Sequence, residues 1–282
     1  MKTIRIIPRL DIKGPNLVKG IHLEGLRVLG KPEDFARYYY ENGADELFYQ
    51  DVVASLYERN SLNNLITNTA KEIFIPLTVG GGIRTISDIN SVLRAGADKV
   101  CINTAAIKNP DFIKEASRVF GSSTIVVAIE AIKQPNGSYF AYTDNGREHT
   151  GIEVVDWAKK VEELGAGEIV ITSVDREGTG LGFEMELIQM ISEVISIPLI
   201  VHGGASDEAN ISIAIKEGKA DAVALASILH YDFIQKNVVP HIGEEEGNTE
   251  FLKSGKTFSR ITPTTIKDIK EYLNNNSISV RL

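Results

Sequence analysis

The chain of 282 residues contains a single cysteine, Cys101, so no disulfide bond can form within it. Cys101 lies in a strand-like apolar run, which predicts a buried structural thiol, since no base for a nucleophile is evident. No uncharged run approaches the ~18 residues of a membrane span. The N-terminus, MKTIRIIPRLD, turns acidic too early for a signal peptide. We therefore expect a soluble cytoplasmic protein without a membrane partner.

Positive charge is also scarce. Lys and Arg number 30 against 38 Asp and Glu, which gives a net charge of −8. The two signs are interspersed, so the sequence offers no broad basic face for the phosphates of a nucleic acid. A small anionic ligand would need a local site. We expect no nucleic-acid partner, and no motif predicts a metal ion or a cofactor.

Short runs rich in β-branched residues are plentiful, and they alternate with helical patterns. The strand-like runs span residues 4–11, 46–51, 76–81, 98–103, 124–130, 168–175, 198–204 and 221–227. A 3.6-residue apolar period marks residues 32–43, 85–96, 151–165 and 207–218. This alternation predicts an α/β fold with parallel strands covered by helices. Eight units favour a closed (β/α)8 TIM barrel, with an open doubly wound sheet as the alternative.

An internal repeat supports the closed barrel. Residues 76–107 align with residues 198–229 through paired glycines, a helix and the following strand. At nearly the same offset, residues 5–13 align with 126–133, which pairs Asp11 with Glu130. The chain therefore reads as two repeated half-barrels in one domain of residues 1–282.

Two segments interrupt the repeat. Residues 134–149 carry a PNG turn and the alternating run YFAYT, which predicts a β-hairpin inserted after the fifth strand. Residues 236–263 are polar and irregular, and residues 264–273 restore a closing helix. The second segment is either a mobile surface insertion or a partner or lid element.

Acidic residues stand at the carboxyl ends of several predicted strands, where a barrel carries its chemistry. Asp11 ends the first strand and Glu130 the fifth, so they would face each other across one mouth. Two such carboxylates can divide general acid and general base work. The alternative is that each caps the next loop. For Asp51 and Asp175, capping or contact with a ligand hydroxyl competes with catalysis, and Lys19 either contacts an anion or is simply solvated.

Two glycine-rich turns predict phosphate sites. VGGG contains Gly81 and Gly82, and HGGA contains Gly203 and Gly204; each turn follows a strand and precedes a helix. Backbone N–H groups there can approach an anion without side-chain obstruction, although tight turns also use glycine. The partner strands end in small residues that suit phosphate oxygens: Asn103, Thr104, Ala226 and Ser227. Paired copies suggest an elongated ligand with a phosphate at each end.

Charged residues also begin four of the strands: Arg5, Glu46, Lys99 and Glu168. They would form a ring across the bottom of the barrel. One interpretation is a salt-bridged plug that keeps water out of the core, because this face of a barrel usually serves stability.

In combination, several stretches resemble the cyclase subunit of imidazole glycerol phosphate synthase: IIPRLDIKG, LVKG, FYQDVVAS, TVGGGIR, ADKVCINTAAI, GAGEIVITSVDREGTG and VHGGA. The resemblance covers residues 4 to about 235 and resumes at IKDIKEYLNNNSISVRL. It implies a barrel of two half-barrels in the histidine pathway. The implied substrate is a bis-phosphorylated aminoimidazole carboxamide ribonucleotide, PRFAR. Ammonia from a glutaminase subunit attacks it, giving imidazole glycerol phosphate and AICAR.

The resemblance also implies residue roles. It assigns general acid/base work to Asp11 and to the carboxylate at position 130, and phosphate binding to both glycine turns with their partner strand ends. It further implies that the ring of Arg5, Glu46, Lys99 and Glu168 gates ammonia entry where the glutaminase docks. Asp98, beside that ring, is an interface candidate.

Three features depart from the family pattern. The family has Asp where this chain has Glu130, usually has Cys where it has Arg9, and lacks the insertion at 236–263. Glu is longer by one methylene, about 1.5 Å, and a misplacement on the order of 1 Å can cost about 10²-fold in rate. Arg9 would tend to hold Asp11 ionised.

These departures leave a second hypothesis beside the cyclase. A paralogue could keep the barrel and gate to conduct ammonia to another enzyme, such as a sugar amidotransferase in surface-polysaccharide synthesis. Asp11, Lys19 and both phosphate turns favour a site that still binds a phosphorylated ligand. A non-catalytic scaffold has no need of paired phosphate turns.

Overall fold

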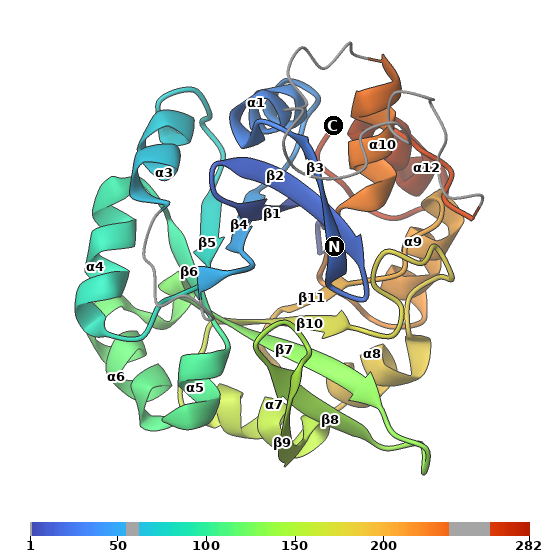
Figure 1. Ribbon diagram of the computed structural model, residues 1–282. Helices are drawn as coiled ribbons and strands as arrows, with labels where there is room; N and C mark the ends of the chain where they lie inside the picture. Colours follow the sequence, from blue (N-terminus) through green and yellow to red (C-terminus); the bar gives the residue numbers. More distant parts are fainter. Residues whose placement is uncertain (1, 55–61, 237–259) are drawn as a thin grey trace.

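The computed structural model describes residues 2–54, 62–236 and 260–282. Its centre is a ring of parallel strands surrounded by helices (Figure 1). The barrel strands are β1 (Arg5–Lys13), β4 (Leu47–Asp51), β5 (Leu77–Gly80), β6 (Lys99–Ile102), β7 (Ile125–Lys133), β10 (Glu168–Ser173), β11 (Leu199–His202) and β12 (Ala222–Leu225). Seven neighbouring pairs run from β10 through β11, β12, β1, β4, β5 and β6 to β7, and a β7–β10 pairing closes the ring. The closure confirms the TIM barrel and excludes the open sheet.

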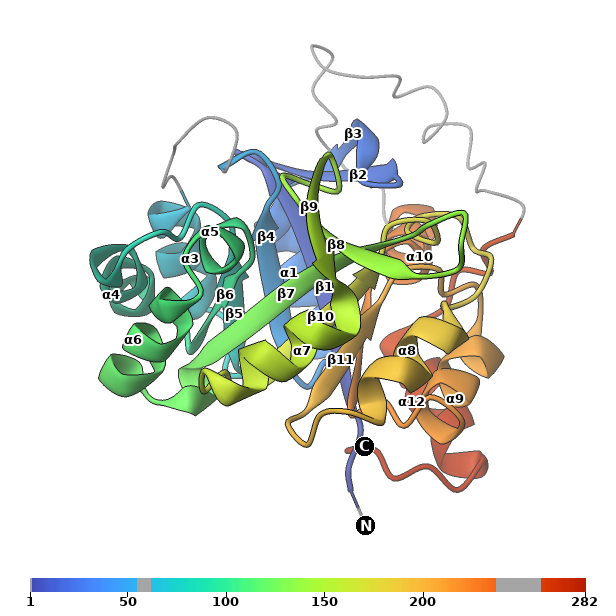
Figure 2. The same cartoon turned by 90° about the horizontal axis from the view of Figure 1, so that it is seen from below.

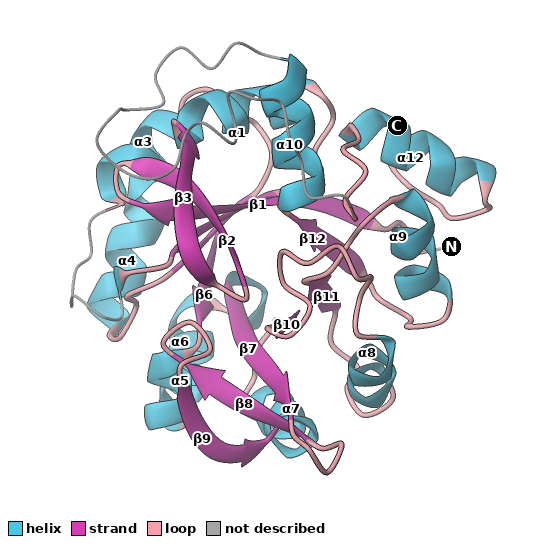
Figure 3. Cartoon of the chain, turned by 45° about the vertical axis from the view of Figure 1, so that its right-hand side comes forward, coloured by secondary structure: helices cyan, strands magenta, loops and turns pink. Residues whose placement is uncertain are grey.

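Helices cover the outside of this ring (Figure 3). They are α1 (Pro32–Glu41), α3 (Asn63–Ala70), α4 (Ile86–Ala95), α5 (Thr104–Lys108), α6 (Asp111–Phe120), α7 (Val154–Glu163), α8 (Met185–Ser192), α9 (Glu208–Lys216), α10 (Ser227–Lys236) and α12 (Ile266–Asn275), with a 3-10 turn η1 (Ser122–Thr124). Local sequence fixes where several begin. Thr85 accepts a hydrogen bond from the backbone of Asp88, whose side chain accepts one in return, so α4 starts with a capping box. Asp207 and Thr265 cap α9 and α12 in the same way, each accepting from a backbone N–H.

The apolar core has two parts. Most of it lies between the strands and the helices, as expected for strands buried on both faces. A smaller cluster fills the barrel interior and includes Ile7, Phe48, Val126, Val170 and Ile200. The interior is therefore packed rather than open between the two ends of the barrel. Within the residues that the structure covers, no helix combines the length and apolarity needed to span a membrane.

Four further strands extend the barrel at one end: β2 (Asn16–Ile21), β3 (Glu24–Gly30), β8 (Tyr139–Thr143) and β9 (Glu148–Glu153). In Figure 2, β2, β3 and β9 rise at the end opposite the two chain termini. The expected hairpin after the fifth strand is present, but its first arm is β7 itself, with Lys133 opposite Tyr139. Strand β9 takes residues 148–153, and α7 consequently begins at Val154 rather than at 151. The β2–β3 pair was not predicted, because its glycines suggested a loop.

The two extensions cross between the half-barrels. His22, in the β2–β3 turn, contacts the loop after β10, with 2.9 Å between its Nδ1 and the Val174 carbonyl oxygen. Asn145, in the β8–β9 turn, donates from its side chain to the carbonyl of Val52, in the loop after β4. Val52 and Val174 are equivalent in the repeat. The extension of each half-barrel therefore contacts the equivalent loop of the other half-barrel.

The polar segment expected at residues 236–263 falls mostly on residues 237–259, which lie outside the described residues. Its end is described: Thr262 donates from its backbone to Ser206, 2.8 Å, and α12 follows at Ile266. The closing helix is therefore confirmed, two residues later than expected. A role of the insertion as a lid or partner element stays a prediction.

Candidate active site at the barrel mouth

Both glycine-rich turns lie at the mouth formed by the carboxyl ends of the strands. Gly81 and Gly82 have φ values of 102° and 72°, and Gly203 and Gly204 have 97° and 106°. A Cβ on Gly81 would lie 2.4 Å from the Asp51 carbonyl oxygen. Tight backbone packing therefore requires glycine here, whether or not an anion binds.

One half of the mouth encloses a cavity of about 210 Å³. Six predicted site residues line it: Asp51, Gly81, Gly82, Asn103, Thr104 and Glu130. The turn after β5, the end of β6 and the acid on β7 thus converge, as parallel strands in a barrel require. The Oδ1 atom of Asn103 is buried without a hydrogen-bond partner. An unpaired buried acceptor is costly unless a ligand or water satisfies it.

Glu130 is buried in this cavity wall, with 8% of its surface exposed. Its Oε2 accepts a hydrogen bond of 2.8 Å from the backbone N–H of Gly146, in the β8–β9 turn. Burial raises the pKa of Glu130 to about 7, against the opposing effects of the Gly146 hydrogen bond and of the Arg9 charge. Such a carboxyl can exchange a proton near neutral pH.

Asp11 is also buried, and it is paired rather than isolated. Its Oδ1 accepts a hydrogen bond of 2.9 Å from Nε of Arg9. Arg9 lines the cavity together with Glu130, whereas Asp11 is not among the lining residues. The guanidinium therefore lies between the cavity and Asp11, and it holds one oxygen of the Asp11 carboxyl group.

The side chain of Lys19 reaches from β2 to the loop after β10. Its ammonium forms a short ion pair with the Glu177 carboxylate, and both side chains are almost fully buried. The other Glu177 oxygen accepts a hydrogen bond of 3.1 Å from the backbone of Leu23, so Glu177 ties the whole β2–β3 turn to the loop after β10. Lys19 is thus engaged with a carboxylate rather than solvated.

The second glycine turn faces a much smaller pocket, of about 20 Å³. Gly203, Gly204, Ala226 and Ser227 line it, as predicted, together with Glu177. A Cβ on Gly204 would lie 2.2 Å from the Gly182 carbonyl oxygen. The two turns are therefore equivalent in backbone but unequal in the space beside them.

The other two strand-end acids make local hydrogen bonds. Asp51 Oδ1 accepts from the backbone of Val53 and Ala54, at 3.0 and 2.9 Å, as a loop cap does. Asp175 Oδ2 accepts from the backbone of Lys133, 2.8 Å away, at the end of β7. Asp51 lines the 210 Å³ cavity, and Asp175 lines neither pocket at the mouth.

At the opposite end of the barrel, the four charged strand starts form a closed ring of ion pairs. Arg5 Nη1 lies 2.9 Å from Glu46 and 3.2 Å from Glu168, while Lys99 Nζ lies 2.9 Å from Glu46 and 3.0 Å from Glu168. Asp98 stands outside the ring, and its Oδ2 accepts from the backbone of Leu77 at 2.8 Å. The barrel bottom is therefore closed by alternating charges.

Comparison with known proteins identifies the family. The family model described as "Histidine biosynthesis protein" matches residues 5–235. The chain belongs to this family. It is 57% identical over 204 residues to the imidazole glycerol phosphate synthase subunit HisF of Legionella pneumophila, covering 72% of this chain and 96% of that protein. The subunit HisF of Alkaliphilus metalliredigens is 46% identical over 232 residues, 82% of this chain and 92% of its own. That of Methanococcus maripaludis strain C5 is 41% identical over an alignment of 302 positions, gaps included, which covers all of both chains.

In this member of the histidine biosynthesis family, the structure adds cavity residues that the sequence did not single out. They are Gln50, Arg84, Lys108, Asp144 and Asn145. Arg84 directly follows the first glycine turn, so the motif TVGGGIR could have been used to predict a positively charged side chain beside that turn. Lys108 ends α5, a short helix that the strand pattern did not reveal. Asp144 and Asn145 come from the β8–β9 turn and reach the mouth only through the tertiary fold.

Two other buried groups complete the site. Burial raises the pKa of the Cys101 thiol to about 12, so the cavity-lining thiol stays protonated, in keeping with a structural role. His202 is buried, and burial and the Arg9 charge hold its pKa well below the usual value. Among the residues of 2–54, 62–236 and 260–282, no cluster of three or more His, Cys, Asp or Glu side chains could hold a metal ion.

Proposed function

We propose that this chain is the cyclase subunit of imidazole glycerol phosphate synthase. It uses ammonia from a glutaminase subunit to convert PRFAR into imidazole glycerol phosphate and AICAR. The observation that carries the proposal is the pair of buried carboxylates, Asp11 and Glu130, in a chain of this family. They lie two and three residues before the ends of β1 and β7, and not at the strand ends as expected. On this proposal residues 1–282 act as one domain, in the cytoplasm, where a reduced buried cysteine is expected.

The environments of the two carboxylates support a division of work. Glu130, with a pKa of about 7, holds a proton part of the time at neutral pH and serves as general acid. Asp11, whose Oδ1 lies 2.9 Å from Nε of Arg9, serves as general base. Pairs of acids in environments that favour opposite protonation states are typical of acid/base catalysis.

The phosphate groups of the substrate would bind at the two glycine turns. The larger cavity offers Gly81 and Gly82, Asn103, Thr104 and two cations, Arg84 and Lys108. In the repeat, Ser206 and the buried His230 stand where Arg84 and Lys108 stand. We therefore expect the first turn to bind its phosphate more tightly, since an anion gains more from nearby charges than from backbone N–H groups alone. Asp51 and Asp175 then hold loops around the mouth, and Lys19, with Gly203, Gly204, Ala226 and Ser227, serves the second phosphate.

The direct test is turnover of PRFAR with ammonium salt at high pH, following AICAR formation. Robust turnover supports the cyclase. Loss of about 10²-fold or more in Glu130→Gln, with partial activity in Glu130→Asp, would assign the general acid. No turnover, with recovery in Glu130→Asp, would contradict the cyclase proposal and favour the ammonia-conducting paralogue. The names of the relatives do not favour that alternative.

The proposed docking face for the glutaminase is the bottom of the barrel, around the ring of Arg5, Glu46, Lys99 and Glu168. Phe74, in the turn between α3 and β5, is 81% exposed there, and it borders a depression of about 370 Å³ with Asp98. A large exposed aromatic beside a hollow is typical of an interface anchor. Ammonia released by a partner on this face would meet the ring first, so opening of its ion pairs would control entry.

A further inference from the structure

The side chain of Arg9 is buried in the upper part of the barrel, and its surface is 4% exposed. It extends from β1 toward β10 and β11. Its Nη1 lies 3.3 Å from Oγ1 of Thr172 and 3.2 Å from Nδ1 of His202, while Nε bonds Asp11. Its guanidinium carbon also lies 5.6 Å from the centre of the Phe48 ring. One guanidinium thus joins three barrel strands.

On the Asp11 side, the contact fixes one carboxylate oxygen. Arg9 and Asp11 are two residues apart on β1, so both side chains point to the same face of the strand, toward the barrel interior. Nε holds Oδ1 at 2.9 Å. Within the described part of the chain, Oδ2 accepts no hydrogen bond, so it is the oxygen available for a reacting group.

On the His202 side, the contact fixes a tautomer. A guanidinium has only donors, so Nδ1 of His202 must accept the hydrogen bond from Arg9. Thr172 can accept from Arg9 and donate to the same Nδ1, 3.3 Å away. The ring proton is therefore on Nε2. His202 lines the pocket beside Gly203 and Gly204. In this tautomer Nε2–H is the one hydrogen-bond donor of the neutral ring.

Stability alone does not account for this arrangement. A buried ion pair is a weak source of stability, because desolvation offsets the attraction between the charges. A pair that served only packing would also not need contacts to Thr172 and His202 on two further strands. The Arg9 guanidinium group instead connects Asp11, the proposed general base, with His202, the histidine beside the second proposed phosphate turn.

We propose that Arg9 is a positioning residue that orients the Asp11 carboxylate and fixes the Nε2–H tautomer of His202 at the same time. The kinetic part of this inference rests on the proposed cyclase function. The structural part does not, so failures of the two can be distinguished.

The structural part is tested by the long-range ¹H–¹⁵N NMR spectrum of the imidazole groups, with His202 assigned through His202→Gln. The wild-type protein and Thr172→Val should show His202 protonated on Nε2 only, because Arg9 still donates to Nδ1. In Arg9→Met, the Thr172 hydroxyl is free to donate or accept, so both tautomers should appear and the Nδ1 resonance should move. An unchanged His202 signal in folded Arg9→Met would overturn the proposal, whatever the activity.

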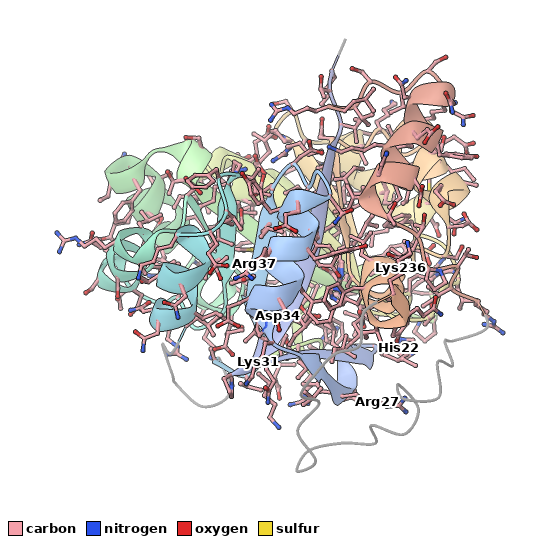
Figure 4. The ribbon with its side chains drawn as sticks, turned by 90° about the horizontal axis from the view of Figure 1, so that it is seen from above. His22, Arg27, Lys31, Asp34, Arg37 and Lys236 are labelled. Carbon is pink, nitrogen blue, oxygen red and sulfur yellow. The ribbon has the colours of Figure 1, made fainter. Side chains whose placement is uncertain are left out.

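The kinetic part uses turnover of PRFAR with ammonium salt. In Arg9→Met, kcat should fall about 10²-fold, as expected for a misplaced catalytic group, with KM changing far less. Arg9→Lys keeps the positive charge but loses the planar set of N–H donors. This variant should remain folded, and its kcat should stay about 10-fold below that of wild type. Arg37→Met is the matched control, because it removes an exposed arginine–glutamate pair from the outer face of α1 (Figure 4). Wild-type kcat in Arg9→Met or Arg9→Lys would overturn the positioning role. Inactive wild-type protein would contradict the cyclase function alone.

Discussion

At the scale of single residues, Glu130 has the most informative environment at the mouth. It lies in the buried part of β7, three residues before the strand ends, and 8% of its surface is exposed. One backbone N–H stabilises its charged form. Burial dominates, and the carboxyl group therefore has a pKa of about 7. The same environment that suits a general acid also has a cost in stability when the group is ionised.

This cost predicts a pH dependence of stability. The folded-state pKa of Glu130, about 7, lies above the value of about 4.3 expected for the unfolded chain. Between these values the folded state binds more protons, so the free energy of unfolding falls as pH rises, by on the order of 3 kcal/mol in total. Glu130→Gln should lack this pH-dependent decrease in the free energy of unfolding. Urea unfolding at pH 5 and pH 8 measures it.

The comparison is between variants, because other groups titrate over the same range. Glu130→Gln should be more stable than wild type at pH 8 and similar at pH 5. Glu115→Gln, at an exposed position of α6, is the control and should follow the wild-type curve. Parallel pH curves for Glu130→Gln and wild type would show that the carboxyl is not desolvated.

At the scale of elements, the glycine turns are constrained by backbone packing. Gly204 combines a φ of 106° with a Cβ position 2.2 Å from a carbonyl oxygen. Gly137, in the β7–β8 turn, has a φ of 90° but open space around its Cβ position. A comparison of alanine variants at Gly137 and Gly204 therefore separates the cost of a positive φ from the cost of a steric clash.

We expect Gly137→Ala to cost about 1 kcal/mol, from the positive φ alone. Gly204→Ala should cost at least about 2 kcal/mol more, since the backbone of the loop after β10 must also move. Thermal or urea unfolding measures both. An equal decrease in the free energy of unfolding for both variants would mean that the backbone around Gly204 can move without loss of stability.

The β2–β3 pair depends on a buried ion pair. Both Lys19 and Glu177 are nearly inaccessible to solvent, and Glu177 also holds the backbone of Leu23. Removing one partner leaves an uncompensated charge, which costs about 3 kcal/mol or leads to local opening.

In Lys19→Met we therefore expect faster amide hydrogen exchange over residues 16–30, with exchange in the barrel strands unchanged. Lys19→Met combined with Glu177→Gln should recover much of the protection, because no charge is left unpaired. Unchanged exchange in the single variant would show that the β-pairing with β1 alone holds these strands in place.

At the scale of the whole molecule, a packed interior separates the two ends of the barrel to which we assign functions. The mouth carries the acids and glycine turns, and the bottom carries the ring of ion pairs with the exposed Phe74. A complex with a glutaminase would therefore join two sites through the length of the barrel.

Phe74→Glu should weaken binding of the glutaminase subunit by at least about 10-fold, because it replaces an aromatic side chain that the proposed complex would bury with a charged one. Turnover with ammonium salt should stay at the wild-type level, since the mouth is unaffected. Titration calorimetry and glutamine-dependent turnover measure the two effects. Ile213→Glu, on the exposed side of α9, is the control. Equal affinities for both variants would remove Phe74 from the interface.

The sequence by itself determined the architecture. Eight apolar runs, the alternating helices and the repeat predicted parallel strands covered by helices and favoured a closed barrel, because periodicity is a local property of the chain. The open sheet was excluded only by the pairing of β7 with β10. The repeat also placed acids at 11 and 130 and glycine pairs at both turns, since strand ends in a parallel barrel share one face. The ring of four charges followed from the same rule.

Only the tertiary structure decided how these residues act on one another. Lys19 is paired with Glu177, 158 positions away, and Arg9 joins Asp11 to His202, 193 positions from Arg9. The pKa of Glu130 depends on burial, on the hydrogen bond from Gly146 in the β8–β9 turn and on Arg9. Such contacts are set by side-chain packing across strands, and neither hydrophobic period nor motif spacing encodes them. The sequence therefore identified the acids near the mouth, and the fold decided which groups each of them contacts.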